Sequence, residues 1–311
     1  MSTRAGEAVA GPTGGPAGIQ DRCAPSALRR GDIRHGTASP VPRWLLVEQP
    51  GGWGVDAVLQ SELDPEVGAA LLARARTAGT RVVLIRRPGR RAPDGPRRWA
   101  VVDSRAGHER VGWGRWERPE QLLDVPLDGP AGEPAGPVYL VCAHGRHDPC
   151  CAIWGRPVAE ALAAARPGQV WECSHVGGDR FAANLLALPH GLYYAHVTAA
   201  AVTDLAAAYE RGEVEPQLLR GRSAFAAPAQ AAQHYARLAL GETGLDALRP
   251  IALARLGDGL WRARLVAPGG GALLVTVRAG LGPPVRLTCS SRTAERPRTW
   301  ELVALRRAAA G

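Results

Sequence analysis

The run Val138-Tyr-Leu-Val-Cys142-Ala-His-Gly-Arg-His-Asp-Pro-Cys150-Cys151 decides how the middle of this chain folds. Its first five residues predict a short buried strand, and the Gly, Asp and Pro that follow predict a turn. From Cys151 to Ala165 the apolar residues recur at helical spacing, and Asp148 and Pro149 are typical of a helix start. The run therefore predicts one thiol at a strand tip and two thiols at the beginning of a helix.

A second run, Trp171-Glu-Cys173-Ser-His175-Val-Gly-Gly-Asp179-Arg180, closes the next predicted strand, Gln169 to Cys173. The two runs together hold four of the six cysteines and three of the eight histidines of the chain. Thiolate and imidazole are the ligands preferred by zinc, copper and iron–sulfur clusters. The composition of these runs is therefore that of a metal site.

The residues after the second run complete a recognisable order of elements. Residues 184–188 and 191–197 predict a hairpin that turns at Pro189-His190, and residues 199–209 predict a helix. The resulting order is strand, helix, strand, hairpin, helix. This order is that of a thioredoxin-like domain.

The same residues carry a family resemblance. Residues 142–151 read Cys-x-His-Gly-x-x-Asp-x-Cys-Cys and residues 174–182 read Ser-His-x-Gly-Gly-x-Arg-Phe-Ala, a combination that resembles the sucrase/ferredoxin-like family. The run from Cys151 to Gly155 is also similar to the second-cysteine run of thioredoxin-like ferredoxins. The resemblance implies a [2Fe-2S] cluster held by two cysteines and by two histidines spaced His-x-x-x-His. By this resemblance Cys142, Cys151 and His175 are expected to be ligands.

The fourth ligand position departs from the family pattern, because Asp179 stands where the second histidine is expected. Three readings remain open: Asp179 ligates through oxygen, Cys173 replaces it, or the site holds no stable cluster. Iron–sulfur chemistry prefers thiolate or imidazole to carboxylate, and Cys173 and His175 share one face of an extended strand. We therefore favour Cys173. Cys142-x-His144 and Cys173-x-His175 also resemble the paired ligands of a Rieske centre, although a Rieske site has a longer second spacing.

The remaining cysteines and the turn histidines have simpler interpretations. Buried free cysteines commonly act as small hydrophobes, and Cys23 and Cys289 are assigned this role. We expect Cys150 to be dispensable for the cluster. His144 and His147 lie in a polar turn and are predicted to be exposed or hydrogen-bonded rather than ligating.

These residues favour an electron carrier with a [2Fe-2S] cluster over an enzyme with its own substrate. One alternative is a thiol redox protein that uses Cys150 and Cys151, whose thiolates a helix start would stabilise. Another is a zinc-binding structural module, which the same number of ligands would suit. A glycosidase would need two acidic side chains across a sugar cleft, and no motif identifies such a pair.

Composition limits the partners and the compartment. All 38 basic residues are arginine, and with 29 acidic residues the formal net charge is +9. No nucleic-acid motif accompanies this charge, which would instead suit acidic redox partner proteins of unknown identity. No apolar run of membrane-spanning length and no hydrophobic signal core are found, so the sequence predicts a cytoplasmic protein without membrane contact. In that compartment clustered cysteines indicate metal or redox chemistry more often than disulfides.

The fold class predicted for the whole chain is α/β to α+β, with four parts. Residues 1–40 are rich in Gly, Ala, Pro and Ser and are expected to form a disordered tail. Residues 41–136 are expected to form an N-terminal α+β half, residues 137–214 the thioredoxin-like ferredoxin domain, and residues 225–311 a small α+β module. The two larger parts are expected to share one sheet system, whereas the small module is expected to carry no ligand cluster and to serve in docking or dimerisation.

Several elements outside the two central runs are also predicted. In the N-terminal half these are strands at 44–48, 81–85, 99–103 and 109–113, and a helix over 61–78 capped by Ser61 or Asp64. Residues 88–96 are expected to form a basic loop, residues 129–137 a connector, and residues 216–222 a linker. A helix over 227–240 and a meander of short strands over 251–305 are expected in the small module.

Overall fold

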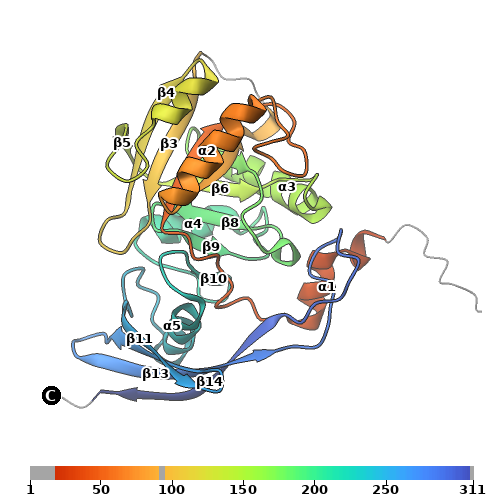
Figure 1. Cartoon of the computed structure of the whole chain (residues 1–311). Helices are drawn as coiled ribbons and strands as arrows, with labels where there is room; N and C mark the ends of the chain where they lie inside the picture. Colours follow the sequence, from red (N-terminus) through yellow and green to blue (C-terminus); the bar gives the residue numbers. More distant parts are fainter. Residues whose placement is uncertain (1–17, 91–94, 309–311) are drawn as a thin grey trace, which may run out of the picture.

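The computed structural model describes residues 18–90 and 95–308, which form one ten-stranded sheet and one four-stranded sheet with their helices (Figure 1). The helices are α1 (Cys23–Arg30), α2 (Pro65–Thr77), α3 (Pro149–Ala165), α4 (Val202–Glu210) and α5 (Ala227–Leu240). The strands are β1 (Arg43–Glu48), β2 (Thr80–Arg86), β3 (Arg97–Asp103), β4 (Arg110–Trp116), β5 (Glu133–Ala135), β6 (Val138–Cys142), β7 (Val170–Cys173), β8 (Leu185–Leu188), β9 (Leu192–Tyr194), β10 (Leu219–Arg222), β11 (Pro250–Gly257), β12 (Leu260–Val266), β13 (Ala272–Leu281) and β14 (Arg298–Arg307).

The large sheet contains the same supersecondary unit twice. Strands β1 and β2 are parallel and joined through α2, and strands β6 and β7 are parallel and joined through α3. Each first strand is then flanked by an antiparallel pair, β3–β4 beside β1 and β8–β9 beside β6. The units meet where β2 and β7 pair antiparallel, with Ile85 opposite Cys173. The expected single sheet system is therefore present, in the order β10-β9-β8-β6-β7-β2-β1-β3-β4-β5.

The two crossover helices begin as the sequence predicts. The Asp64 side chain accepts hydrogen bonds from the backbone N–H groups of Glu66 and Val67 at the start of α2. The Asp148 side chain accepts one from the N–H of Cys150 at the start of α3. In each helix a proline occupies the first position, where its missing N–H costs nothing.

Alternation along the strands divides the large sheet into two buried faces. Leu45 and Val47 of β1 pack with Leu71 of α2, whereas Val141 of β6 packs with residues of α3 and α4. A third cluster of buried side chains lies on the opposite face of the sheet and extends across both units, from Trp44 in β1 to Tyr193 in β9. Because residue types alternate with period two, each strand contributes to both layers. The architecture is the mixed α+β fold expected from the sequence.

The predicted linker over residues 216–222 is wrong, because strand β10 lies there and pairs with β9. Its buried residues include Arg220 and Arg222 rather than alternating apolar side chains, so it lacks the usual sequence signal of a strand. Arg222 forms ion pairs with Glu109 and Asp246. The predicted connector over 129–137 likewise contains the short edge strand β5, which pairs with β4.

The predicted disordered tail differs from the structure over residues 18–40, and residues 1–17 lie outside the described part of the chain. Helix α1 forms here, and the segment after it packs against the C-terminal module. The Trp300 indole donates a hydrogen bond to the carbonyl of Gly36 at 3.3 Å. The backbone of Ala38 exchanges two hydrogen bonds with the Gln230 side chain, at 3.2 and 3.1 Å. Partners far along the chain therefore order a segment whose own composition does not.

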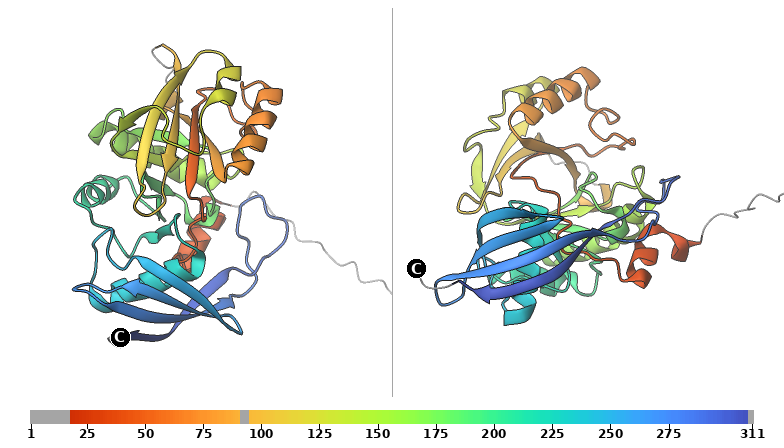
Figure 2. Two further views of the ribbon diagram at one scale, coloured as in Figure 1. Left: turned by 60° about the vertical axis from the view of Figure 1, so that its left-hand side comes forward. Right: turned by 60° about the horizontal axis from the view of Figure 1, so that its bottom comes forward.

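The C-terminal module forms as predicted, with α5 packed on an antiparallel meander of β11 to β14. The connection between β13 and β14, residues 282–297, is long and extends away from the module towards α1 (Figures 1 and 2). The module is thus tied to the rest of the protein on two sides, through residues 36–38 and through residues 282–297.

Within the described residues, no helix is long and apolar enough to span a membrane.

Two stacked histidines at this contact make the stability of the fold depend on pH. The rings of His35 and His234 stack at 4.0 Å, and burial lowers their pKa values to about 3 and about 4. An unfolded histidine titrates near pH 6.5, so between about pH 6.5 and 4 the unfolded chain binds protons that the folded chain excludes. The free energy of unfolding should therefore decrease as the pH falls through this window, by about 3 kcal/mol per histidine.

The His234→Phe variant keeps the ring stack but removes one titrating group, so its loss of stability between pH 7 and pH 5 should be smaller than in the wild type. Urea unfolding at the two pH values measures this difference. His108 lies in an exposed turn, and His108→Asn serves as the matched control that keeps the wild-type dependence. An equal loss of stability in His234→Phe and the wild type would contradict the assignment.

Candidate metal centre

Two buried thiols and one imidazole meet at the end of β6. Cys142 is the last residue of β6, Cys151 lies in the first turn of α3, and His175 follows β7. One ligand atom from each lies within 4.8 Å of the others. Gly155 permits this approach, because a Cβ at that position would lie 2.1 Å from the carbonyl oxygen of Cys142. The three residues that the resemblance implies as ligands are thus brought together.

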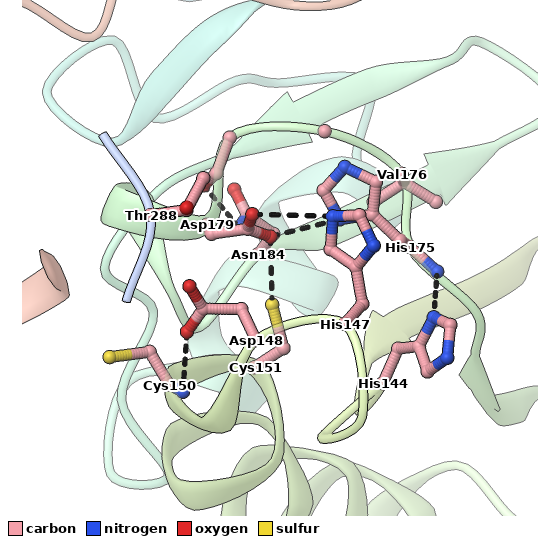
Figure 3. A network of polar contacts seen from close by, with 12 residues as sticks. His144, His147, Asp148, Cys150, Cys151, His175, Val176, Asp179, Asn184 and Thr288 are labelled. Atoms are coloured by element: carbon pink, nitrogen blue, oxygen red, sulfur yellow. Dashed lines mark hydrogen bonds and ion pairs between the residues drawn. The ribbon is translucent and has the colours of Figure 1, made fainter. Parts of the chain in front are cut away.

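A second group of donors overlaps the first and shares His175. It comprises His147, His175 and Asp179, again with ligand atoms within 4.8 Å of one another. The Asp179 carboxylate lies 2.9 Å from Nδ1 of His175 and 3.5 Å from Nε2 of His147 (Figure 3). The two imidazole rings stack with centroids 3.7 Å apart. Cys151 Sγ donates a hydrogen bond to the same carboxylate at 3.2 Å, so Asp179 links the two groups.

The ionisable side chains of the two donor groups shift one another's pKa values. Hydrogen bonds from Cys151 and Cys173 lower the pKa of Cys142, although its burial opposes this, and they favour the thiolate form of that side chain. Burial alone would lower the pKa of His175, but Asp179 and Cys142 raise it to about 9. Burial alone would raise the pKa of Asp179, but hydrogen bonds from His147 and His175 lower it to about 2. These contacts favour a thiolate at Cys142, a carboxylate at Asp179 and a protonated imidazole at His175.

The loop that carries His175 and Asp179 is held by two arginines. Arg81 donates hydrogen bonds to the carbonyls of His175 and Val176, at 2.8 and 3.2 Å. Arg220 of β10 is buried and donates to the carbonyl of Gly177 at 2.8 Å and to the Asn184 side chain at 2.7 Å. Gly177 and Gly178 both have positive φ, and no larger residue fits at the second position because a Cβ there would meet the Arg220 guanidinium. The loop is thus anchored on its inner side by hydrogen bonds from both arginines.

His144 supports the site without joining either donor group. Its Nε2 lies 2.6 Å from the carbonyl of Gly54, and its Nδ1 accepts a hydrogen bond from the backbone N–H of His175 at 3.3 Å. Burial lowers the pKa of this imidazole. The prediction of a hydrogen-bonded His144 is confirmed. Because both ring nitrogens are engaged, the resemblance to a Rieske pairing finds no support in the position of His144.

Cys173 lies beside the site but outside both donor groups. It is fully buried, it pairs with Cys142 in the parallel register of β6 and β7, and it is hydrogen-bonded to that thiol. Strand β7 ends at Cys173, so the extended geometry that would place Cys173 and His175 on one face does not continue. The structure places Asp179, not Cys173, in a donor group with His175.

His147 is the residue that the sequence argument assigned differently. Its side chain is 32% exposed and contacts Asp179, as a hydrogen-bonded turn residue should, but it also completes a donor group with His175. The sequence feature that points to this role is the position of His147 in the same turn as His144, five residues after Cys142. Which of the two turn histidines faces the site depends on the turn geometry and not on spacing alone.

The other cysteines form a separate group. The Cys150 and Cys151 side chains point in different directions (Figure 3). Cys150 joins Cys23, Cys289 and Asp148, with ligand atoms within 4.8 Å of one another. Cys23 and Cys289 are free cysteines that pack with Ala24, Cys150 and Ala182 in one apolar cluster, as expected of small hydrophobes, and they also belong to this donor group. The connection between β13 and β14 carries Cys289 to the start of α3, so one residue of the C-terminal module belongs to this group. Cys23 and Cys289 are 266 residues apart, so their spacing does not predict that they meet in the fold.

The fold and the donors define a class of protein with a cysteine- and histidine-rich site at the carboxyl end of two parallel strands. The sucrase/ferredoxin-like family model matches residues 35–221, which include both units of the large sheet and this site, and the chain belongs to that family. No curated protein and no solved structure matches the chain.

The close approach of α3 to β6 gives a direct test of the site geometry. In Gly155→Ala the added methyl group meets the Cys142 carbonyl, so the helix must move and the Cys142–Cys151 pair must separate. We expect the free energy of unfolding to fall by about 1–3 kcal/mol and metal content to decrease. Chemical denaturation and elemental analysis measure both quantities. Gly136→Ala is the control, because its Cβ enters open space; equal behaviour of the two variants would contradict the tight contact.

Proposed function

We propose that this protein is an electron carrier with a [2Fe-2S] cluster bound by mixed cysteine and histidine ligands, rather than an enzyme with its own substrate. The observation that carries the proposal is the meeting of two buried thiols with two partly exposed, stacked imidazoles around one loop and one helix start. A bound cluster would supply one-electron redox chemistry at this position.

The spacing of the donors suits a binuclear group. A single tetrahedral ion needs four donors within about 4 Å of one another, as follows from bond lengths of about 2.0–2.3 Å. Among the described residues, Cys142, Cys151 and His175 converge as a group of three, and the group of His147, His175 and Asp179 continues outward from it. Two overlapping groups cover a longer site than one ion requires. This extent favours a [2Fe-2S] cluster over a zinc ion here.

We assign the fourth ligand position to His147. Asp179 contacts both imidazoles and the Cys151 thiol. These are the contacts of a carboxylate that orients metal ligands through hydrogen bonds without binding the metal itself. With His147 as ligand, the set would contain two cysteines and two histidines, the composition that the family resemblance implies. Asp179 as an oxygen ligand is the second choice, and Cys173 is the third because it lies outside both donor groups.

The exposed side of the site would be the route for electrons. Cys142 and Cys151 are fully buried, whereas the side chains of His147 and His175 are 32% and 24% exposed. Arg146 in the same turn is exposed, and a neighbouring cavity of about 360 Å³ is lined in part by Arg146 and Arg156. A basic rim around the imidazole edge would attract acidic redox partner proteins.

The thiol redox alternative has less support. It requires the Cys150 and Cys151 sulfurs to act as a pair, but each belongs to a different donor group. Cys150 Sγ lies 3.5 Å from Cys289 Sγ, whereas Cys151 Sγ contacts Asp179. The two thiols therefore have different partners despite their adjacency in the sequence.

Iron and acid-labile sulfide analysis of protein purified without oxygen tests the proposal. We expect about two irons and two sulfides per chain, together with visible absorption that bleaches on one-electron reduction. Zinc and free thiols do not absorb in the visible. A colourless protein that has no iron after anaerobic reconstitution would reject the proposal.

The ligand assignment is tested by three single variants. In His147→Ala we expect most of the iron to be lost, and any residual reduced cluster to show magnetic coupling to one histidine nitrogen in place of two. In Asp179→Asn and Cys173→Ser we expect the cluster to be retained, the former with weaker binding, by about 10-fold or more, because it loses a positioning group. Pulsed electron paramagnetic resonance and iron analysis measure these outcomes. Loss of the cluster in Cys173→Ser with full retention in His147→Ala would reverse the assignment.

A further inference from the structure

Three cysteine thiols and one carboxylate converge at the start of α3, on the side away from the first site. Cys289 Sγ lies 3.5 Å from Cys150 Sγ and 3.5 Å from Cys23 Sγ. Cys23 Sγ lies 3.5 Å from Oδ2 of Asp148. One donor atom from each of the four residues lies within 4.8 Å of all the others, so four donors meet at one point.

The carboxylate of this group is buried without a cationic partner. Asp148 is fully buried, and its oxygens accept hydrogen bonds from the backbone N–H groups of Cys150 at 2.8 Å and Cys289 at 2.6 Å. None of the ion pairs found within residues 18–90 and 95–308 involves Asp148. Buried charges in proteins are generally paired with an opposite charge or coordinate a metal. The surroundings of Asp148 supply three thiols in place of a basic side chain.

We propose that Cys23, Cys150, Cys289 and Asp148 bind one zinc ion that joins α1, the start of α3 and residues 282–297. In a tetrahedral zinc site the bond lengths of about 2.3 Å to sulfur and about 2.0 Å to oxygen give edges of about 3.8 Å between sulfurs and about 3.5 Å between sulfur and oxygen. The 3.5 Å contacts of this group are close to both values.

The surface beside this group provides an entry path and compensating charge. A cavity of about 450 Å³ opens there and is lined by Cys23 and Cys289 together with Arg22, Arg30 and Arg286. Three thiolates and one carboxylate around a divalent ion leave a net negative charge, which these guanidinium groups offset. A zinc ion can therefore reach the donors from solvent.

This site is distinct from the one proposed for electron transfer. Cys23 and Cys289 lie outside residues 35–221, the region that the family model matches. Adjacent residues of α3 serve the two sites, because Cys150 faces Cys289 whereas Cys151 faces Asp179. The zinc site holds whether or not a cluster binds at the first site. Its role would be to fix two chain segments, 266 residues apart at Cys23 and Cys289, on the helix that carries Cys151.

A disulfide explains this arrangement less well. It would join two of the three thiols with loss of two electrons to an oxidant, and it would leave the third thiol unpaired and the buried carboxylate without a cationic partner. It also requires sulfur atoms about 2.0 Å apart. The four-donor convergence is accounted for by a metal ion and not by a disulfide.

Metal analysis of the full chain with the first site disabled tests the proposal. In a Cys142→Ser/Cys151→Ser background grown with zinc, we expect one zinc per chain, and further substitution of Cys289→Ser should remove it. Ser290→Ala, an exposed neighbour of Cys289, is the matched control that keeps the zinc. Cobalt in place of zinc should give the visible bands of a tetrahedral thiolate site in the control only. Zinc content that is equal with and without Cys289, or a disulfide in anaerobically purified protein, would overturn the proposal.

Limited proteolysis of otherwise unmodified protein gives a second readout. Trypsin can cleave after Arg286 and Arg292 in the segment that the zinc ion would hold. Cleavage there should become faster by about tenfold or more in Cys289→Ser or after zinc chelation, because release of the ion lets the segment open. Iron content of Cys289→Ser should stay unchanged, which separates this result from a failure of the electron-transfer proposal. Unchanged cleavage in Cys289→Ser would overturn the zinc site.

Discussion

The contact between the first turns of α3 and the tip of β6 is the constraint on which both sites depend. Gly155 allows the helix to approach the Cys142 carbonyl at a distance that any larger residue would prevent. The Asp148 cap fixes where the helix starts, and successive helical residues project about 100° apart. Cys151 is thereby directed to Cys142 and Asp179, and Cys150 to Cys23 and Cys289. One short segment thus gives two adjacent thiols two different environments.

The elements around this contact could be predicted from the sequence because their signals are local. The apolar run 138–142 gives β6, the Asp148-Pro149 start gives α3, and residues 227–240 give α5 with the predicted bounds. Strand β10 could not be predicted, because its buried arginines form hydrogen bonds and ion pairs with residues distant in sequence. The ordered structure around Gly36 could not be predicted for the same reason. It depends on contacts with Trp300 and Gln230, which the local composition does not reveal.

The site residues divide in the same way. Cys142 and Cys151 could be selected because a strand tip and a helix start place them predictably, whereas His175 follows from the family resemblance. The structure brings the three residues together. His147 depends on the path of a tight turn, and Cys289 depends on a long connection between two strands of another module. Spacing carries no information on either. The preference for Cys173 as the fourth ligand depends on an extended strand that places Cys173 and His175 on one face. Strand β7 ends at Cys173, so the structure does not provide that strand.

Parallel metal analysis of Cys150→Ser and Cys151→Ser tests the central claim, that adjacent thiols serve different metal sites. Each anaerobically purified variant is analysed for iron, acid-labile sulfide and zinc. The account predicts that Cys151→Ser loses iron and sulfide but keeps zinc, whereas Cys150→Ser loses zinc but keeps iron and sulfide. Loss of the same metal in both variants, or of neither metal in either variant, would contradict it.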